Sequence, residues 1–172
     1  MSQTETSLAT LSEGEKFPSL IGRIAGILGA EEFPTGERAQ LKRMTPDTPP
    51  PLAFYRLAYR YLPEGWERRW EAWMTLVAGL AIMGSGGHNP ERRAGQVLAE
   101  SNYSEKRLER LLAAEDETLH SLLLRAVRFL AAKGAVVNWL DFAYLLGLAG
   151  DPQYARMRIA QDYYRNLDQK KD

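Results

Sequence analysis

The sequence predicts an all-α protein, a compact bundle of about eight or nine helices. Apolar residues recur every three or four positions along most of the chain, which is the spacing of helices with one buried face. No segment of useful length combines two-residue alternation with β-branched enrichment, the pattern of a half-buried strand, so we expect no sheet. Prolines stand between the apolar segments, where they fit loops and the first turns of helices.

Four helices are expected in the first half of the chain, over residues 15–28, 36–44, 51–62 and 66–83. Thr35 precedes the second helix and can cap its N-terminus. Pro51 suits the first turn of the third helix, and Pro63 ends it. The fourth helix has the strongest apolar pattern, with one seam at Trp66, Trp70, Trp73, Val77 and Leu80.

Five further helices follow the Gly-rich loop Gly84–Pro90. The first is expected near residues 93–100. The second should begin after a cap at Ser104 and bury Leu108, Leu111 and Leu112. The last three are expected over residues 118–134, 138–148 and 152–170. In the last helix Arg156 falls on the apolar stripe and should meet a fixed acid or phosphate, whereas Arg158 should point outward. We expect a single domain, residues 1–172, in which the loop joins an N-terminal sub-bundle (about 15–84) to a C-terminal one (about 91–170).

Composition narrows the class of protein. The 172 residues hold 22 basic and 22 acidic side chains, with 45% hydrophobic residues, as in ordinary globular proteins. Cysteine is absent, which excludes disulfides, thiolate nucleophiles and cysteine-ligated metals. Met1–Thr10 lacks the features of a signal peptide, and no apolar run reaches the roughly 18 residues that span a membrane. We expect a cytoplasmic protein without membrane contact.

The residues that could carry chemistry are few. His88 and His120 are the only histidines, and neither belongs to a metal-binding sequence pattern. Asp162 with Asp168, or the acids at residues 115–117, are the carboxylates that a Mg²⁺-dependent nuclease would require, although such acids are more often solvated helix ends. We therefore predict no catalytic residue, cofactor or metal site, and keep a nuclease as one rival hypothesis.

The basic segment Thr118–Gly134 is the most informative part of the chain. It carries Arg125, Arg128 and Lys133 and no acid. Arg125 and Arg128 lie three residues apart and outside the apolar arc of the predicted helix, so both should project from its exposed flank. This arrangement suits a polyanion such as nucleic acid, while the alternative is a solvated face whose acids come from other helices.

An ordered series of short motifs resembles the CasB family, the small subunit of the type I-E CRISPR surveillance complex Cascade. The motifs are Ala39–Arg43, Leu52–Leu57, Trp66 with its long helix, Gly95–Glu100, Ser104–Leu108, Leu124–Arg125, Asn138–Trp139 and the Arg156–Tyr164 segment. Each motif is weak alone, and the series covers the chain from about Arg38 to Tyr164. Gln96 departs from the family, which more often has arginine there.

The resemblance implies an all-helical, non-enzymatic subunit of Cascade that occurs as a pair. Its implied partners are the large and backbone subunits, a second copy of itself, CRISPR RNA, and target DNA including the displaced strand. Stabilising an R-loop needs only modest backbone contacts, because R-loop formation is nearly balanced in energy.

The predicted nucleic-acid-binding residues come mostly from the resemblance. It implies phosphate contacts without base readout by Lys42, Arg43, Arg107, Arg125, Arg156 and Arg158, with Arg68 beside the tryptophan seam as a weaker addition. Arg128 joins them from the basic segment. The main alternative function is a helical adaptor whose basic patches dock on acidic protein surfaces.

Overall fold

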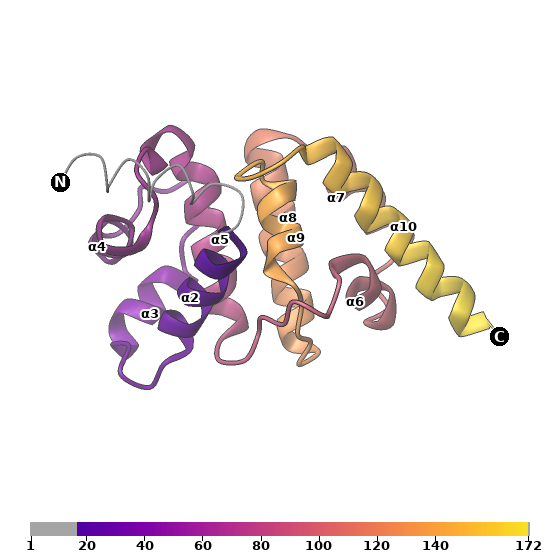
Figure 1. Ribbon diagram of the computed structural model, residues 1–172, viewed down its shortest axis with the longest axis horizontal. Coiled ribbons are helices and arrows are strands. Elements are labelled where there is room, and N and C mark those ends of the chain that lie inside the picture. Colours follow the sequence, from indigo (N-terminus) through magenta and orange to yellow (C-terminus); the bar gives the residue numbers. More distant parts are fainter. Residues whose placement is uncertain (1–16, 172) are drawn as a thin grey trace.

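The computed structural model describes residues 17–171, and these form nine α-helices, one 3₁₀ helix and no named strand, which confirms the all-α fold (Figure 1). The helices are α2 (Phe17–Gly29), α3 (Thr35–Lys42), α4 (Leu52–Tyr61), the 3₁₀ helix η1 (Trp66–Arg69), α5 (Trp70–Met83), α6 (Ala94–Glu100), α7 (Glu105–Ala113), α8 (Asp116–Ala132), α9 (Trp139–Leu145) and α10 (Pro152–Lys171). Glu15, the predicted first helical residue, and the segment Met1–Thr10 lie outside the described residues.

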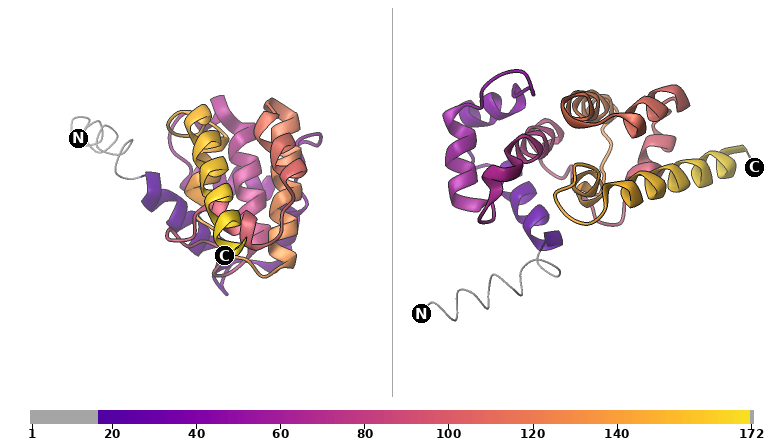
Figure 2. Two further views of the ribbon diagram at one scale, coloured as in Figure 1. Left: turned by 90° about the vertical axis from the view of Figure 1, so that its right-hand side faces the viewer. Right: turned by 90° about the horizontal axis from the view of Figure 1, so that it is seen from above.

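Helix α5 is the centre of the arrangement. Helices α2, α3 and α4 lie on one side of it, and α8 and α9 lie on the other, followed by α6, α7 and α10 (Figures 1 and 2). Residues 72–81 of α5 are all buried, because this stretch is uncharged and meets neighbours on every side. The predicted tryptophan seam is therefore only part of the buried surface, and Trp66 and Trp70 are the half-buried members of it.

One hydrophobic cluster extends through both halves of the described chain. Two close helix contacts within it depend on glycine. A methyl group on Gly79 would stand 2.3 Å from the indole of Trp139, so glycine allows α5 to approach α9. A methyl group on Gly95 would stand 2.1 Å from the carbonyl oxygen of Ile159, so α6 and α10 can meet only where the side chain is missing. Because both halves share this core, the division into two sub-bundles stays a prediction.

Three basic side chains cap the C-terminal ends of other helices, two of them far away in sequence. Arg38 donates hydrogen bonds to carbonyl oxygens at the end of α2, at 2.9 and 2.7 Å. Arg69 donates to two carbonyls that follow α9, at 2.8 and 3.0 Å. Lys170 donates to two carbonyls at the end of α6, at 2.8 and 3.2 Å. Each cation satisfies carbonyls that lack an intrahelical partner and lies at the negative end of the helix dipole.

The loop that was predicted as the joint between the sub-bundles is bonded to the segment before α9. The Nδ1 atom of His88 accepts a hydrogen bond from the backbone N–H of Trp139 at 3.1 Å. Backbone hydrogen bonds also join Asn89 to Val137 and Val137 to Gly87, at 3.1 and 3.2 Å. Burial lowers the pKa of His88, which favours the neutral imidazole that this acceptor role requires.

Several helix boundaries differ from the prediction for local reasons. The predicted helix over 66–83 begins as the separate 3₁₀ helix η1. Thr35 is the first residue of α3 rather than its cap, and the N-terminus of α3 has no side-chain cap. The predicted Ser104 cap is confirmed, since its hydroxyl accepts from the Arg107 backbone N–H at 3.2 Å. Within residues 17–171, no helix combines the length and the apolar character needed to cross a membrane.

Candidate nucleic-acid interface

The α7–α8 basic face is a group of four exposed cations: Arg107 on α7, Arg125 and Arg128 on α8, and Lys133 at the end of α8. The buried side of α7 rests against α8, so Arg107 lies beside the outward face of α8. None of the four forms an ion pair within residues 17–171. The face therefore presents positive charge that no acid of the described chain neutralises at contact distance.

Two aromatic rings hold part of this face in place. The guanidinium carbon of Arg107 lies 5.5 Å from the ring centroid of Phe129 and 6.0 Å from that of Tyr103. The Nζ atom of Lys133 lies 5.4 Å from the Phe129 centroid. Both cations therefore lie within cation–π range of Phe129 while remaining open to solvent. This arrangement fixes their position without consuming their hydrogen-bond donors.

All four cations were predicted from the sequence, Lys133 only as part of the basic segment, but the contact that organises them was missed. Lys133 was part of the predicted basic segment, and Phe129 lies one turn from both Arg125 and Lys133 on α8. This four-residue spacing is a signal that sequence analysis could have used. The helix that carries the segment begins two residues earlier than predicted, so its first turn also holds two acids, Asp116 and Glu117.

Lys42 and Arg43 form a separate basic site at the end of α3. Both are exposed, and neither has an ionic partner among the described residues. Helix α3 lies on the other side of α5 from α7 and α8 (Figure 1). The structure therefore divides the predicted binding set between two ends of the molecule.

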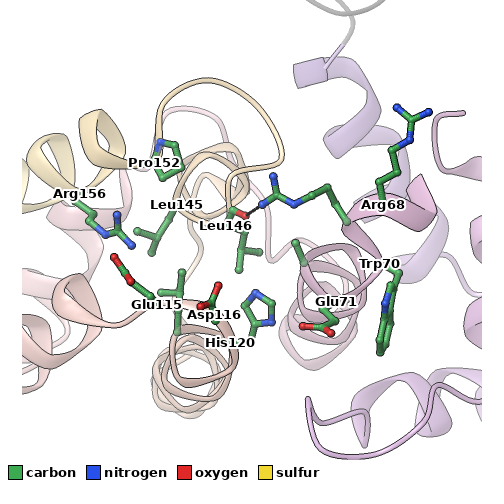
Figure 3. Close-up of a pocket in the computed structure, with 13 residues that line it drawn as sticks. Arg68, Trp70, Glu71, Glu115, Asp116, His120, Leu145, Leu146, Pro152 and Arg156 are labelled. Carbon is green, nitrogen blue, oxygen red and sulfur yellow. Dashed lines mark hydrogen bonds between the residues drawn. The ribbon is translucent and has the colours of Figure 1, made fainter. Parts of the chain in front are cut away.

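Arg68 and Arg156 belong to a cavity of about 420 Å³ between η1, α5, α8 and α10. Arg68 points away from the cavity, whereas Arg156 points toward Glu115 (Figure 3). The cavity wall carries both signs of charge, because Glu71 and Asp116 also line it. This balance makes the cavity a poor site for a polyanion.

Arg156 is half-buried, as predicted, but its hydrogen-bond partner is not an acid. Its Nη2 donates to the carbonyl oxygen of Ala114 at 3.1 Å, just before α8. Its Nε is buried without a hydrogen-bond partner among the described residues. Within the described chain, the partner of Arg156 is therefore a backbone carbonyl rather than the expected acid, and a phosphate contact stays a prediction.

Arg158 is also half-buried, which corrects the expectation that it points outward. Its guanidinium carbon lies 5.9 Å from the ring centroid of Tyr154, one turn earlier on α10. It lines a second cavity, of about 270 Å³, together with Asp141. Burial raises the pKa of Asp141, and the nearby charge of Arg158 opposes that rise.

One of the carboxylates proposed for a nuclease, Asp162, has a structural role. Asp162 is buried and lies 2.9 Å from Nε of Arg93 and 3.6 Å from Nη1 of Arg165. Among the described residues, no three His, Asp or Glu side chains are placed to hold a metal ion. Asp162 therefore serves an ion pair between α10 and the start of α6.

Comparison with known proteins bears on the identity of this fold. The model of the CRISPR-associated protein Cse2 family matches residues 37–164. The chain belongs to the Cse2 family. The matched range holds all eight predicted binding residues and the α7–α8 basic face. No curated protein matches the sequence.

Solved structures agree on the fold of the family. A chain in E. coli Cascade bound to a PAM-containing dsDNA target is 24% identical, with a TM-score of 0.66, and the match covers 86% of this chain and 95% of that one. A chain in a CRISPR RNA-guided surveillance complex is 22% identical, with a TM-score of 0.64, covering 89% and 94%. A chain from such a complex in a pre-nicking state is 21% identical, with a TM-score of 0.63 and the same coverage.

Proposed function

We propose that this protein is a non-catalytic, nucleic-acid-binding structural subunit of a Cascade surveillance complex. In this role it contacts CRISPR RNA and target DNA and stabilises the R-loop in antiviral defence. Membership of the Cse2 family supports the proposal, and the α7–α8 basic face is the observation that carries it. Its four cations are exposed and have no acidic partner among the described residues, and two of them, Arg107 and Lys133, lie over the same ring, that of Phe129.

The chemistry of this face suits phosphate rather than base edges. Arginine presents five donors in a planar fork. Arg125 and Arg128 are exposed on neighbouring turns of α8, and Arg107 is exposed on α7. Binding should therefore be independent of sequence and depend on salt through the release of counterions.

Salt titration of nucleic-acid binding tests the proposal. Fluorescence anisotropy with a labelled single strand and its duplex should give affinities that fall linearly with salt on logarithmic axes. Arg125→Ala should reduce that slope by about 0.7 for the single strand and about 0.9 for the duplex. Arg23→Ala on α2, an exposed cation outside the face, is the matched control and should leave the slope unchanged.

Two outcomes would contradict the proposal. A strong preference for one sequence over its scramble at equal salt would indicate base readout. An unchanged slope in Arg107→Ala, Arg125→Ala and Arg128→Ala alike would favour the adaptor, in which these cations meet acidic protein surfaces. Assembly with the other Cascade subunits, with and without this protein, then shows whether R-loop stability depends on it.

A further inference from the structure

Helix α4 exposes aromatic side chains that the fold does not use. Its inner side is buried through Ala53, Phe54, Leu57 and Ala58. Its outer side carries Leu52, Tyr55 and Tyr59, whose exposed fractions are 77%, 46% and 88%. We call this outer side, with Arg56 and Arg60, the α4 tyrosine face. Surface helices usually carry charged residues at such positions, so the exposed rings call for an explanation.

Charge on this face favours an anionic partner. Helix α4 contains two arginines and no acid. Arg56 forms an ion pair with Glu37 at the start of α3, which fixes one arginine beside the rings. Arg60 is exposed and has no ionic partner among the described residues. Each tyrosine is thus followed directly by an arginine, and one cation remains available to a phosphate.

The alternation of tyrosine and arginine fits unpaired nucleotides better than a duplex. Every base has a flat face that can stack on a tyrosine ring, but in a duplex those faces are already stacked on each other. Tyr55 and Tyr59 are one helical turn apart, about 6 Å along the axis, so two rings can serve neighbouring bases. A stacking site of this kind has little sequence preference, as the proposed function requires.

We propose that the α4 tyrosine face is a stacking platform for single-stranded nucleic acid, with Tyr59 as its main ring and Arg60 as its phosphate contact. This inference rests on the proposed function and adds a second contact to it. Helix α4 lies at the opposite end of the molecule from α7 (Figures 1 and 2). An unpaired strand held at both sites would run along the protein, with phosphates at one end and stacked bases at the other.

The test is a comparison of oligo(dT) with an abasic strand of equal length, which keeps the phosphates but removes the bases. Stacking is worth about 1–3 kcal/mol per base, so Tyr59→Ala should weaken oligo(dT) binding by about fivefold or more. Tyr59→Phe keeps the ring and should bind within about twofold of the unchanged protein. Tyr164→Ala removes an exposed tyrosine of α10 and is the matched control.

The proposal further requires that Tyr59→Ala bind the abasic strand and a duplex as well as the unchanged protein does. Equal oligo(dT) affinity with and without the ring would overturn it, as would an equal loss on all three ligands. A change of oligomeric state in Tyr59→Ala with unaltered oligo(dT) binding would make the face a protein contact instead. If the unchanged protein bound no strand at any salt, the proposed function itself would fail. If it bound oligo(dT) equally well with and without the Tyr59 ring, only the stacking platform would fail.

Discussion

Basic side chains at the helix ends and those on the α7–α8 basic face differ in what their charges meet. Arg38, Arg69 and Lys170 each donate to backbone carbonyls at the end of another helix. Arg107 and Arg125 carry the same positive charge, but their side chains contact no carbonyl or carboxylate in the described chain. The first group stabilises the fold, and the second remains available for a ligand.

This difference shows why arginine content alone does not predict binding. The chain contains 22 basic side chains, and several of them act as helix caps or ion-pair partners. A substitution that removes a cap should change stability and leave binding intact. A substitution on the α7–α8 basic face should do the reverse, so each experiment below measures both quantities.

Arg93→Ala should give the largest loss of stability. Its partner Asp162 is buried, with an 8% exposed side chain, and would lose its nearest cation. Breaking a buried pair costs about 3–5 kcal/mol, and we expect about 3 because Arg93 itself is 40% exposed. Arg92→Ala is the control, since its pair with Glu100 is exposed on both sides and should contribute less than about 1 kcal/mol. Equal denaturant midpoints for Arg93→Ala and Arg92→Ala would contradict this expectation.

Arg69→Ala should cost about 2 kcal/mol, because two carbonyls after α9 lose a charged donor. The neighbouring Arg68→Ala should change the free energy of unfolding by less than about 0.5 kcal/mol, since Arg68 is exposed and points away from the cavity. Chemical denaturation of both variants, with nucleic-acid binding as the second readout, makes the comparison. A loss of binding in Arg69→Ala at unchanged stability would move Arg69 into the binding group.

Arg156→Ala should cost about 1 kcal/mol, because a packed stem and one hydrogen bond to the Ala114 carbonyl are lost. Arg158→Ala removes a cation–π contact with Tyr154 and should cost less, about 0.5 kcal/mol. Thermal unfolding and anisotropy of the two variants would show whether either arginine binds nucleic acid. Equal midpoints would place Arg156 among the ordinary surface residues.

His88 must stay neutral to accept its hydrogen bond, so the stability of the protein should depend on pH. Burial lowers the pKa of His88 below its unfolded value of 6.5. Its contribution is therefore complete above pH 6.5 and is lost as the pH falls through the lower pKa of the folded state. Stability measured from pH 7.5 downward should fall less steeply in His88→Asn, whose amide oxygen can accept from Trp139 without titrating. His120 is also buried with a lowered pKa and contributes to the same slope in both proteins.

The smallest effect on stability is expected for Arg107→Ala, Arg125→Ala and Arg128→Ala. Arg125→Ala and Arg128→Ala should change the free energy of unfolding by less than about 0.5 kcal/mol, because these side chains are exposed and unpaired in the described chain. Arg107→Ala should cost about 0.5 kcal/mol, because it also loses its cation–π contact with Phe129. Their effect should appear instead in the salt slope of nucleic-acid binding. A stability loss comparable to that of Arg69→Ala would end the distinction between the two groups of cations.

The sequence alone determined the helices of this protein and their order. Helical periodicity, the Ser104 cap and the prolines around α4 act over one or two turns, so they can be read without knowledge of neighbours. The ordered motifs also led to the family, which the match over residues 37–164 supports independently. The largest difference of this kind was in α5, where ten buried residues in a row, 72–81, leave no single buried seam.

Only the tertiary structure decided which cations are available. Arg69 lies 77 residues before one of the carbonyls that it caps, and Lys170 lies 71 residues after one of its own. Such partners depend on how helices cross, and no local pattern encodes that crossing. The same is true of Gly95, whose missing side chain admits the backbone of α10. The sequence supplies the charges, and the packing of distant helices determines which of them reach solvent.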